Sequence, residues 1–86
     1  MPKVEIYTEM MCGYCHQAKA LLAEKKVEFK EISVGFHPKA RAEMIQRANG
    51  HSTVPQIFIN DRHIGGYDDL YALDSAGKLD QLLADK

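Results

Sequence analysis

Two cysteines three residues apart, Cys12 and Cys15, stand between a strand-like segment and a helical pattern, and the chain has no other cysteine. Residues 3–8 alternate as a strand does, and from Tyr14 to about Lys25 apolar residues recur at helical spacing. A cysteine pair at i and i+3 across a helix start can open and close one small disulfide, and that helix end favours a thiolate. The segment therefore predicts a redox site where a strand passes into a helix.

The rest of the chain continues to alternate between the two kinds of element. The expected order is a strand at 3–8, a helix at 14–25, a strand at 29–34, a helix at 38–48, strands at 56–59 and 62–64, a helix opening at 67–69, and a last amphipathic segment near 79–83. This β-α-β-α-β-β-α order with a C-terminal helical tail predicts an α/β fold, a four-stranded mixed sheet with helices on both faces. A chain of 86 residues holds one modest core, so we expect a single domain over residues 1–86.

Composition narrows the class of protein. A hydrophobic content of 45% and a charged content of 27% are typical of a soluble globular protein. The net charge of -1 gives no reason to expect nucleic acid or an anionic membrane as a partner. No apolar run approaches the roughly 20 residues that span a bilayer, and the N-terminal segment does not resemble a signal peptide. We therefore expect a cytoplasmic protein, in a reducing compartment where a permanently closed disulfide is unusual.

Thiol–disulfide exchange requires two cysteines with different environments. One must be exposed and reactive, and the other must lie close enough to resolve the mixed disulfide. Cys12, at the junction of loop and helix, suits the nucleophile, and Cys15, one turn inside the helix, suits the resolving cysteine.

The same residues admit two other kinds of chemistry. Cys12 to His16 matches the C-x-x-C-H pattern of covalent haem attachment, but that pattern belongs to exported, largely helical proteins. A closed zinc site needs two more ligands than one C-x-x-C supplies, and neither His16 nor His51 has the spacing of a zinc finger. We therefore expect no metal site within one chain, whereas an iron–sulfur cluster shared between two chains stays open.

A second candidate segment, 53–56, reads Thr-Val-Pro-Gln and directly precedes a strand. A proline there fits an ordinary strand entry. With a C-x-x-C upstream, a cis Val54–Pro55 bond is the other interpretation. It would leave the N–H and C=O of Val54 free to pair with an extended, peptide-like ligand.

A third candidate segment, 65–69, reads Gly-Gly-Tyr-Asp-Asp and opens the third helix. The glycines allow a ligand to approach the backbone, and first-turn N–H groups attract an anion. Asp68 adds a charge that could pair with an ammonium group, so the segment suits an α-amino-acid end. Plain helix capping by Asp68 or Asp69 is the alternative.

These three segments, in this order, resemble the glutaredoxin family of the thioredoxin fold. The resemblance covers nearly the whole chain and is strongest to the short bacterial dithiol glutaredoxins, in residues 4–8, 12–20, 53–59 and 64–73. It implies an oxidoreductase that uses glutathione as reductant and adduct. Cys12 would take glutathione from a mixed disulfide, a second glutathione would release it, and Cys15 would complete the exchange with protein disulfides.

The resemblance also implies a set of glutathione contacts. By analogy, Thr53 and Val54 bind the tripeptide backbone, Asp68 holds the γ-glutamyl end with the backbone around it, Tyr14 packs beside the bound sulfur, and Arg41 meets the glycyl carboxylate. The full set of implied contacts is Tyr14, Arg41, Thr53, Val54, Pro55, Gly66, Tyr67 and Asp68. The implied partners are glutathione, glutathionylated proteins and disulfide substrates such as ribonucleotide reductase, bound by a monomer.

Two positions depart from the family pattern. Glu9 stands where many glutaredoxins have a lysine that assists the thiolate and the glutathione carboxylate, so the usual electrostatic help is missing. Gly13 replaces the proline of the common Cys-Pro-Tyr-Cys site. Some glutaredoxins with a small residue there assemble a 2Fe–2S cluster between two protomers, held by their nucleophilic cysteines and two glutathiones. A cluster-binding homodimer through Cys12 is therefore the alternative function, although Cys15 argues against a purely monothiol cluster carrier.

Overall fold

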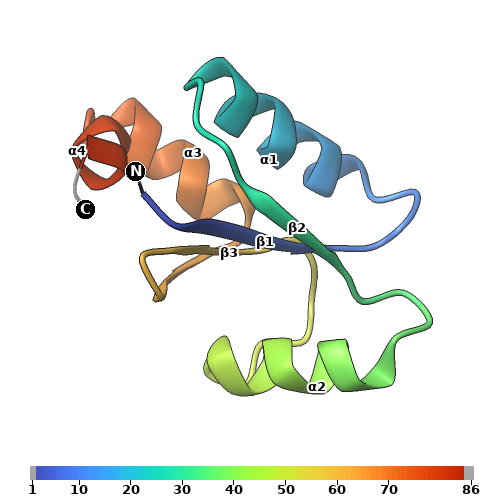
Figure 1. The fold of residues 1–86 in the computed structure, drawn as a ribbon. Helices are drawn as coiled ribbons and strands as arrows, with labels where there is room; N and C mark the ends of the chain where they lie inside the picture. Colours follow the sequence, from blue (N-terminus) through green and yellow to red (C-terminus); the bar gives the residue numbers. More distant parts are fainter. Residues whose placement is uncertain (1, 85–86) are drawn as a thin grey trace.

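A computed structural model describes residues 2–84, so residues 1, 85 and 86 of the expected domain lie outside the described part. Its elements follow the predicted order (Figure 1). They are β1 (Val4–Thr8), α1 (Gly13–Glu24), β2 (Lys30–Ser33), α2 (Pro38–Arg47), β3 (Gln56–Ile59), β4 (Arg62–Gly65), α3 (Tyr67–Ser75) and α4 (Leu79–Ala84). The expected α/β architecture is confirmed.

The four strands form one mixed sheet in the order β2-β1-β3-β4. β1 runs parallel to β2 and antiparallel to β3, and β3 and β4 form an antiparallel hairpin. Helices α1 and α3 cover one face of the sheet and α2 covers the other (Figure 1). The short α4 continues from α3 and packs on the same side, which agrees with the predicted helical tail.

β1 lies inside the sheet, and all five of its residues are buried. Successive residues of this strand point to opposite faces of the sheet, and helices cover both faces. Ile6 belongs to the larger core cluster beneath α1 and α3, whereas Tyr7 belongs to a smaller cluster beneath α2 that includes Met44. Because both of its faces are buried, β1 is a fixed base for the loop that leads to Cys12.

The boundaries of the elements differ slightly from the sequence-based expectation. α1 begins at Gly13, one residue early, because Cys12 caps the helix. β2 is shorter than expected and omits Phe29 and Val34. In the hairpin, Asn60 and Asp61 have φ of 52° and 67°, the left-handed conformation that two-residue hairpin turns require.

One contact that the sequence analysis did not anticipate attaches α2 to the sheet. The Arg47 guanidinium donates to Glu5 Oε1 at 2.8 Å and to the Tyr7 hydroxyl at 2.7 Å, and it stacks 4.1 Å from the centroid of the Phe58 ring. Glu5 is an acidic residue on a central strand, only 9% exposed, and Arg47 supplies its counter-charge. This arginine therefore makes a buried carboxylate tolerable beneath α2.

We expect Arg47→Ala to lower the free energy of unfolding by about 2–4 kcal/mol, because it leaves the Glu5 carboxylate buried without a partner. Arg62→Ala, at an exposed position of β4, is the control and should change stability by less than about 0.5 kcal/mol. Urea denaturation of both variants measures the difference. Equal losses in the two variants would contradict the role given to Arg47.

Candidate active site

The start of α1 treats the two cysteines differently. Cys12 is the N-cap, and its Sγ accepts a hydrogen bond from the backbone N–H of Cys15 at 3.1 Å. The Cys12 side chain is partly exposed, whereas Cys15 is only 2% exposed. Both residues are free thiols. The first turn therefore holds one sulfur at the surface and the other inside, as the sequence predicted.

The environment of Cys15 disfavours its thiolate. Burial is the largest cause that raises the pKa of Cys15, to about 12, and hydrogen bonding with Cys12 adds to it. At neutral pH Cys15 is therefore a protonated thiol. A disulfide arriving from solvent meets Cys12 first, both because Cys12 is accessible and because Cys15 is not ionised.

The segment 53–55 lies beside Cys12. The Val54–Pro55 bond is cis, as the second of the two interpretations expected. The Val54 carbonyl oxygen lies 4.0 Å from Cys12 Sγ and accepts a long hydrogen bond from the thiol. A polar backbone group therefore stands directly next to the sulfur of the candidate nucleophile.

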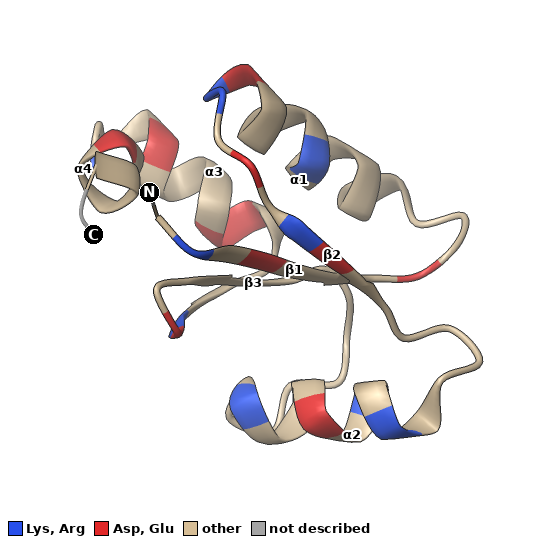
Figure 2. Ribbon diagram, viewed as in Figure 1, with Lys and Arg blue, Asp and Glu red and all other residues tan. Residues whose placement is uncertain are grey.

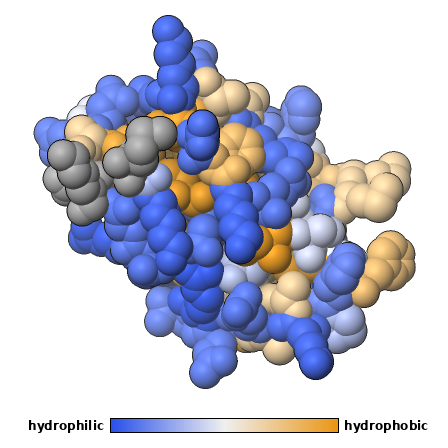
Figure 3. Space-filling view, in the orientation of Figure 1, coloured by the Kyte–Doolittle hydropathy of each residue, from blue (hydrophilic) through white to orange (hydrophobic). Residues whose placement is uncertain are grey.

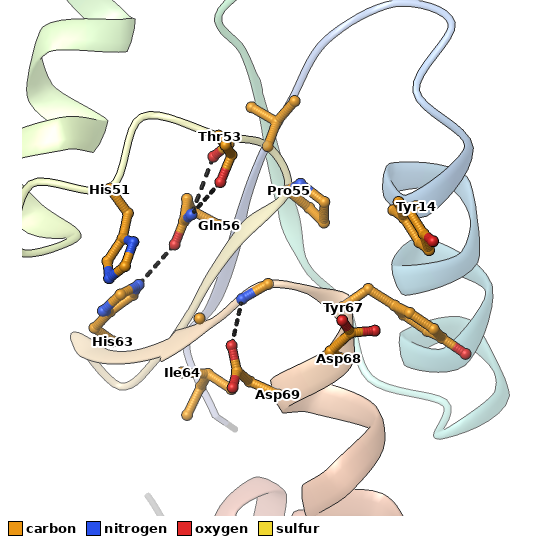
Figure 4. A pocket seen from close by; sticks show the side chains of 13 residues that line it. Tyr14, His51, Thr53, Pro55, Gln56, His63, Ile64, Tyr67, Asp68 and Asp69 are labelled. Carbon is orange, nitrogen blue, oxygen red and sulfur yellow. Dashed lines mark hydrogen bonds between the residues drawn. The ribbon is translucent and has the colours of Figure 1, made fainter.

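The two acidic residues in the first turn of α3, Asp68 and Asp69, have different roles. Asp69 Oδ2 accepts a hydrogen bond from the N–H of Gly66 at 3.1 Å, so Asp69 caps the helix (Figure 4). Gly65 has φ of +119°, and a Cβ at this position would overlap the Asp69 carboxylate. Because Asp69 makes the capping bond, the exposed Asp68 is available to a ligand.

A groove of about 460 Å³ joins these segments. Figure 4 shows Tyr14 on α1 facing the start of α3, with the 53–56 segment along the opposite wall. The Tyr14 and Tyr67 rings stack with centroids 6.2 Å apart and close one end of the groove. The implied glutathione contacts that line the groove are Tyr14, Thr53, Val54, Pro55, Gly66, Tyr67 and Asp68.

Cys12 does not line this groove but lines a second hollow, and its sulfur contacts the groove through the Val54 carbonyl oxygen. The second hollow, of about 630 Å³, is lined by both cysteines and by the loop 9–11. In that loop Met10 is 78% exposed and Met11 is fully exposed. Figure 3 shows apolar groups protruding on the side of the molecule that carries the loops before α1 and α2. Cys12 therefore lines a hollow that is more apolar than the groove, and it meets the groove at the Val54 carbonyl.

Arg41 is the one implied glutathione contact that does not line the groove. Its Nη2 donates to Glu9 Oε1 at 2.5 Å, and its Nη1 donates to the backbone oxygen of Ser52 at 2.9 Å. The guanidinium thus spans the loop that leads to Cys12 and the loop that leads to Val54. The resemblance implies that positions 9 and 41 lie near the same ligand, but nothing in the sequence indicates the contact between Glu9 and Arg41.

A histidine cluster at the far end of the groove was also missed. His63 Nε2 lies 2.7 Å from Gln56 Oε1, and its ring lies 6.0 Å from that of His51 (Figure 4). Burial is the main cause that lowers the pKa of His63, and the charge of His51 adds to it. A two-residue turn at 60–61 places His63 opposite Phe58, and Gln56 lies two residues along the same face of β3. The sequence could therefore have indicated that Gln56 and His63 are diagonal neighbours.

Two features of residues 2–84 bear on other functions. None of the helices described is long and apolar enough to cross a membrane. The described residues also contain no group of three or more histidine, cysteine, aspartate or glutamate side chains arranged to hold a metal ion.

A reactive sulfur at the surface with a second sulfur one turn deeper is the arrangement that thiol–disulfide exchange uses. With the mixed sheet between helices, it defines a thiol–disulfide oxidoreductase of the thioredoxin-like fold. The family model described as Glutaredoxin matches residues 4–64, and the chain belongs to the glutaredoxin family.

Individual relatives agree with this assignment. The chain is 58% identical to glutaredoxin 3 of Escherichia coli strain K12 over 83 residues, which is 96% of this chain and 99% of the relative. The buckwheat glutaredoxin–glutathione complex is similar at 28% identity and a TM-score of 0.86, covering 95% of this chain and 76% of that one. A structure named "Metal Binding of Glutaredoxins" shares 57% identity at a TM-score of 0.72, covering 96% and 89%.

We expect Gly65→Ala to destabilise the protein by at least about 1 kcal/mol more than Gly77→Ala. Both glycines have positive φ, so each variant incurs backbone strain, but only at Gly65 does a Cβ meet the Asp69 carboxylate. Chemical denaturation gives the difference, and the amide shift of Gly66 reports on the capping bond. A cost no greater than that of Gly77→Ala would contradict the close approach of Asp69.

Proposed function

We propose that this chain reduces protein–glutathione mixed disulfides and protein disulfides with glutathione, as a cytoplasmic monomer. The observation that carries the proposal is the inequality of the two sulfurs. Cys12 is accessible and accepts a backbone hydrogen bond, whereas burial keeps Cys15 protonated. Glutathionylated proteins and disulfide proteins, ribonucleotide reductase among them, are the proposed partners.

In the proposed glutathione route, the Cys12 thiolate attacks the glutathione sulfur of a mixed disulfide. The protein–glutathione S–S bond breaks, a Cys12–glutathione S–S bond forms, and the protein sulfur leaves and takes up a proton. A second glutathione thiolate then attacks the glutathione sulfur on Cys12, which releases glutathione disulfide and restores Cys12. The raised pKa of Cys15 slows its attack on the adduct, and so leaves time for the second glutathione.

In the proposed dithiol route, Cys12 attacks a protein disulfide and forms a mixed disulfide with the substrate. Cys15 loses its proton and attacks the Cys12 sulfur, which releases the second substrate thiol and closes the Cys12–Cys15 disulfide. The hydrogen bond from the Cys15 N–H to Cys12 Sγ shows that the first turn brings the two residues together. Two glutathiones then reduce the closed disulfide.

The groove beside Cys12 is the proposed seat of the glutathione moiety. The tripeptide backbone pairs with Val54, flanked by Thr53 and Pro55, and its sulfur meets Cys12 beside Tyr14. The γ-glutamyl carboxylate meets the first-turn N–H groups of α3. Its ammonium meets Asp68, which the capping role of Asp69 leaves available. The relative from buckwheat, solved as a complex with glutathione, supports this assignment.

We expect Cys12→Ser to abolish glutathione-dependent reduction of a glutathionylated peptide, and Cys15→Ser to retain at least about half of the wild-type rate. The first variant removes the nucleophile, whereas the second removes only the resolving thiol, which the glutathione route does not use. The assay follows peptide release with wild type as the reference. An inactive wild type in its reduced, folded form would contradict the proposal, and so would a Cys12→Ser variant with normal activity.

A glutathione-ligated 2Fe–2S cluster between two copies of the chain is the second candidate. Two observations favour it. A Cβ at Gly13 would meet no neighbour, so a second chain has room to approach the Cys12 sulfur. A structure concerned with metal binding by glutaredoxins also lies among the similar chains. In this arrangement Cys12 would be the ligand from each copy.

Anaerobic reconstitution with iron, sulfide and glutathione tests this second candidate. Cluster binding predicts a coloured protein of dimeric mass, lost in Cys12→Ser and kept in Cys15→Ser, because the latter cysteine is buried and not a ligand. A colourless monomer after reconstitution would contradict it.

A further inference from the structure

The ion pair between Glu9 and Arg41 engages the arginine that the resemblance assigns to the glycyl carboxylate of glutathione. Figure 2 shows the acidic residue on the loop between β1 and α1 and the basic residues on α2. In the molecule the Glu9 carboxylate contacts Arg41 Nη2 directly. Both side chains are only partly covered, with exposed fractions of 39% for Glu9 and 35% for Arg41, so a ligand from solvent can reach them.

Arg41 is also held in place by the chain itself. Its second guanidinium nitrogen donates to the Ser52 carbonyl, two residues before Val54, and Glu9 lies three residues before Cys12. The cation therefore stands between the two loops that flank the Cys12 sulfur. In the proposed binding mode the γ-glutamyl end of the tripeptide lies at α3, so its glycyl carboxylate is the end that extends toward this cation.

When glutathione is bound, the Glu9 carboxylate and the glycyl carboxylate compete for the guanidinium of Arg41. In the free protein Glu9 occupies Nη2. A glycyl carboxylate must either displace Glu9 or share Arg41 with a second negative charge, and both alternatives weaken binding. A thiol without that carboxylate does not meet this competition.

We propose that Glu9 is a specificity-determining residue that competes with the terminal carboxylate of the bound thiol for Arg41. This inference rests on the proposed glutathione function. It predicts that the chain discriminates less between glutathione and its uncharged glycyl esters than a version without Glu9 does. The substrate class that Glu9 penalises least is the disulfide of a peptide-like thiol that lacks a terminal carboxylate.

The experiment measures an exchange equilibrium in the Cys15→Ser background, where the mixed disulfide cannot be resolved internally. Cys12 thiol and glutathione disulfide form the Cys12–glutathione disulfide and one reduced glutathione, and mass spectrometry counts the two protein forms. The same equilibrium is measured with the disulfide of glutathione glycyl ethyl ester. The ratio of the glutathione constant to the ester constant isolates the effect of the glycyl carboxylate. Any effect of a variant on the Cys12 sulfur itself is common to both constants and cancels.

Glu9→Gln is expected to raise this ratio by about two- to fivefold, the factor for an ion pair between partly exposed groups. Glu24→Gln, which removes the same charge from the exposed last residue of α1, is the matched control and should leave the ratio unchanged. An equal rise for glutathione and ester would overturn the proposal, because it would reflect a general charge effect. A fall in both constants together with a lower melting temperature would also overturn it, because the Glu9–Arg41 pair would then stabilise the fold rather than compete with the ligand.

A double-mutant comparison tests direct competition. Arg41→Gln should lower the ratio more in the Glu9→Gln background than in the presence of Glu9, because there the guanidinium is free to meet the ligand. Strictly additive effects would overturn the competition and leave only long-range repulsion. Failure of the proposed function would give a different result. If the Cys15→Ser protein, with Glu9 and Arg41 unchanged, formed no mixed disulfide with glutathione or its ester, the glutathione role itself would be refuted.

Discussion

The hydrogen bond between the Cys15 N–H and the Cys12 sulfur is the contact on which the site depends. It is the N-cap contact of α1, and β1, which is buried on both faces, holds the preceding loop and the start of α1 in a fixed place. The helix then turns Cys15 into the core beside Ala18 and Leu22, the residues that fasten α1 to the sheet. Two identical thiols become different because packing of one helix exposes one and desolvates the other.

Sheet topology supplies the second half of the site. β3 lies next to β1, so the cis-proline segment that precedes β3 reaches the loop that follows β1, although more than forty residues separate Val54 from Cys12. β4 then returns the chain to the start of α3 at the same edge of the groove. Backbone groups form much of this surface, and that suits a ligand which is itself a short peptide.

Local patterns were sufficient to predict the fold and to single out the segments 12–15, 53–56 and 65–69, whereas the set of groove residues came from the resemblance to glutaredoxins. The helical spacing of Cys15, Ala18 and Leu22, and the residues on either side of the hairpin turn, each carry their own signal over a few positions. Contacts between distant charged groups carry no such signal. Arg47 with Glu5, and Arg41 with Glu9, each join α2 to β1 or to the loop after it, and only the assembled layers bring them together. The second pair also changes the role expected of Arg41, because this arginine already binds the Glu9 carboxylate before any ligand is present.

The fold itself separates the reactivity of the two cysteines. The direct test is the rate at which iodoacetamide alkylates each cysteine of the reduced wild-type protein, mapped by peptide mass spectrometry between neutral and alkaline pH. We expect only Cys12 to be modified at neutral pH, and Cys15 to react only after unfolding or at strongly alkaline pH, as its burial and raised pKa require. Comparable rates for the two cysteines in the folded protein at neutral pH would contradict it.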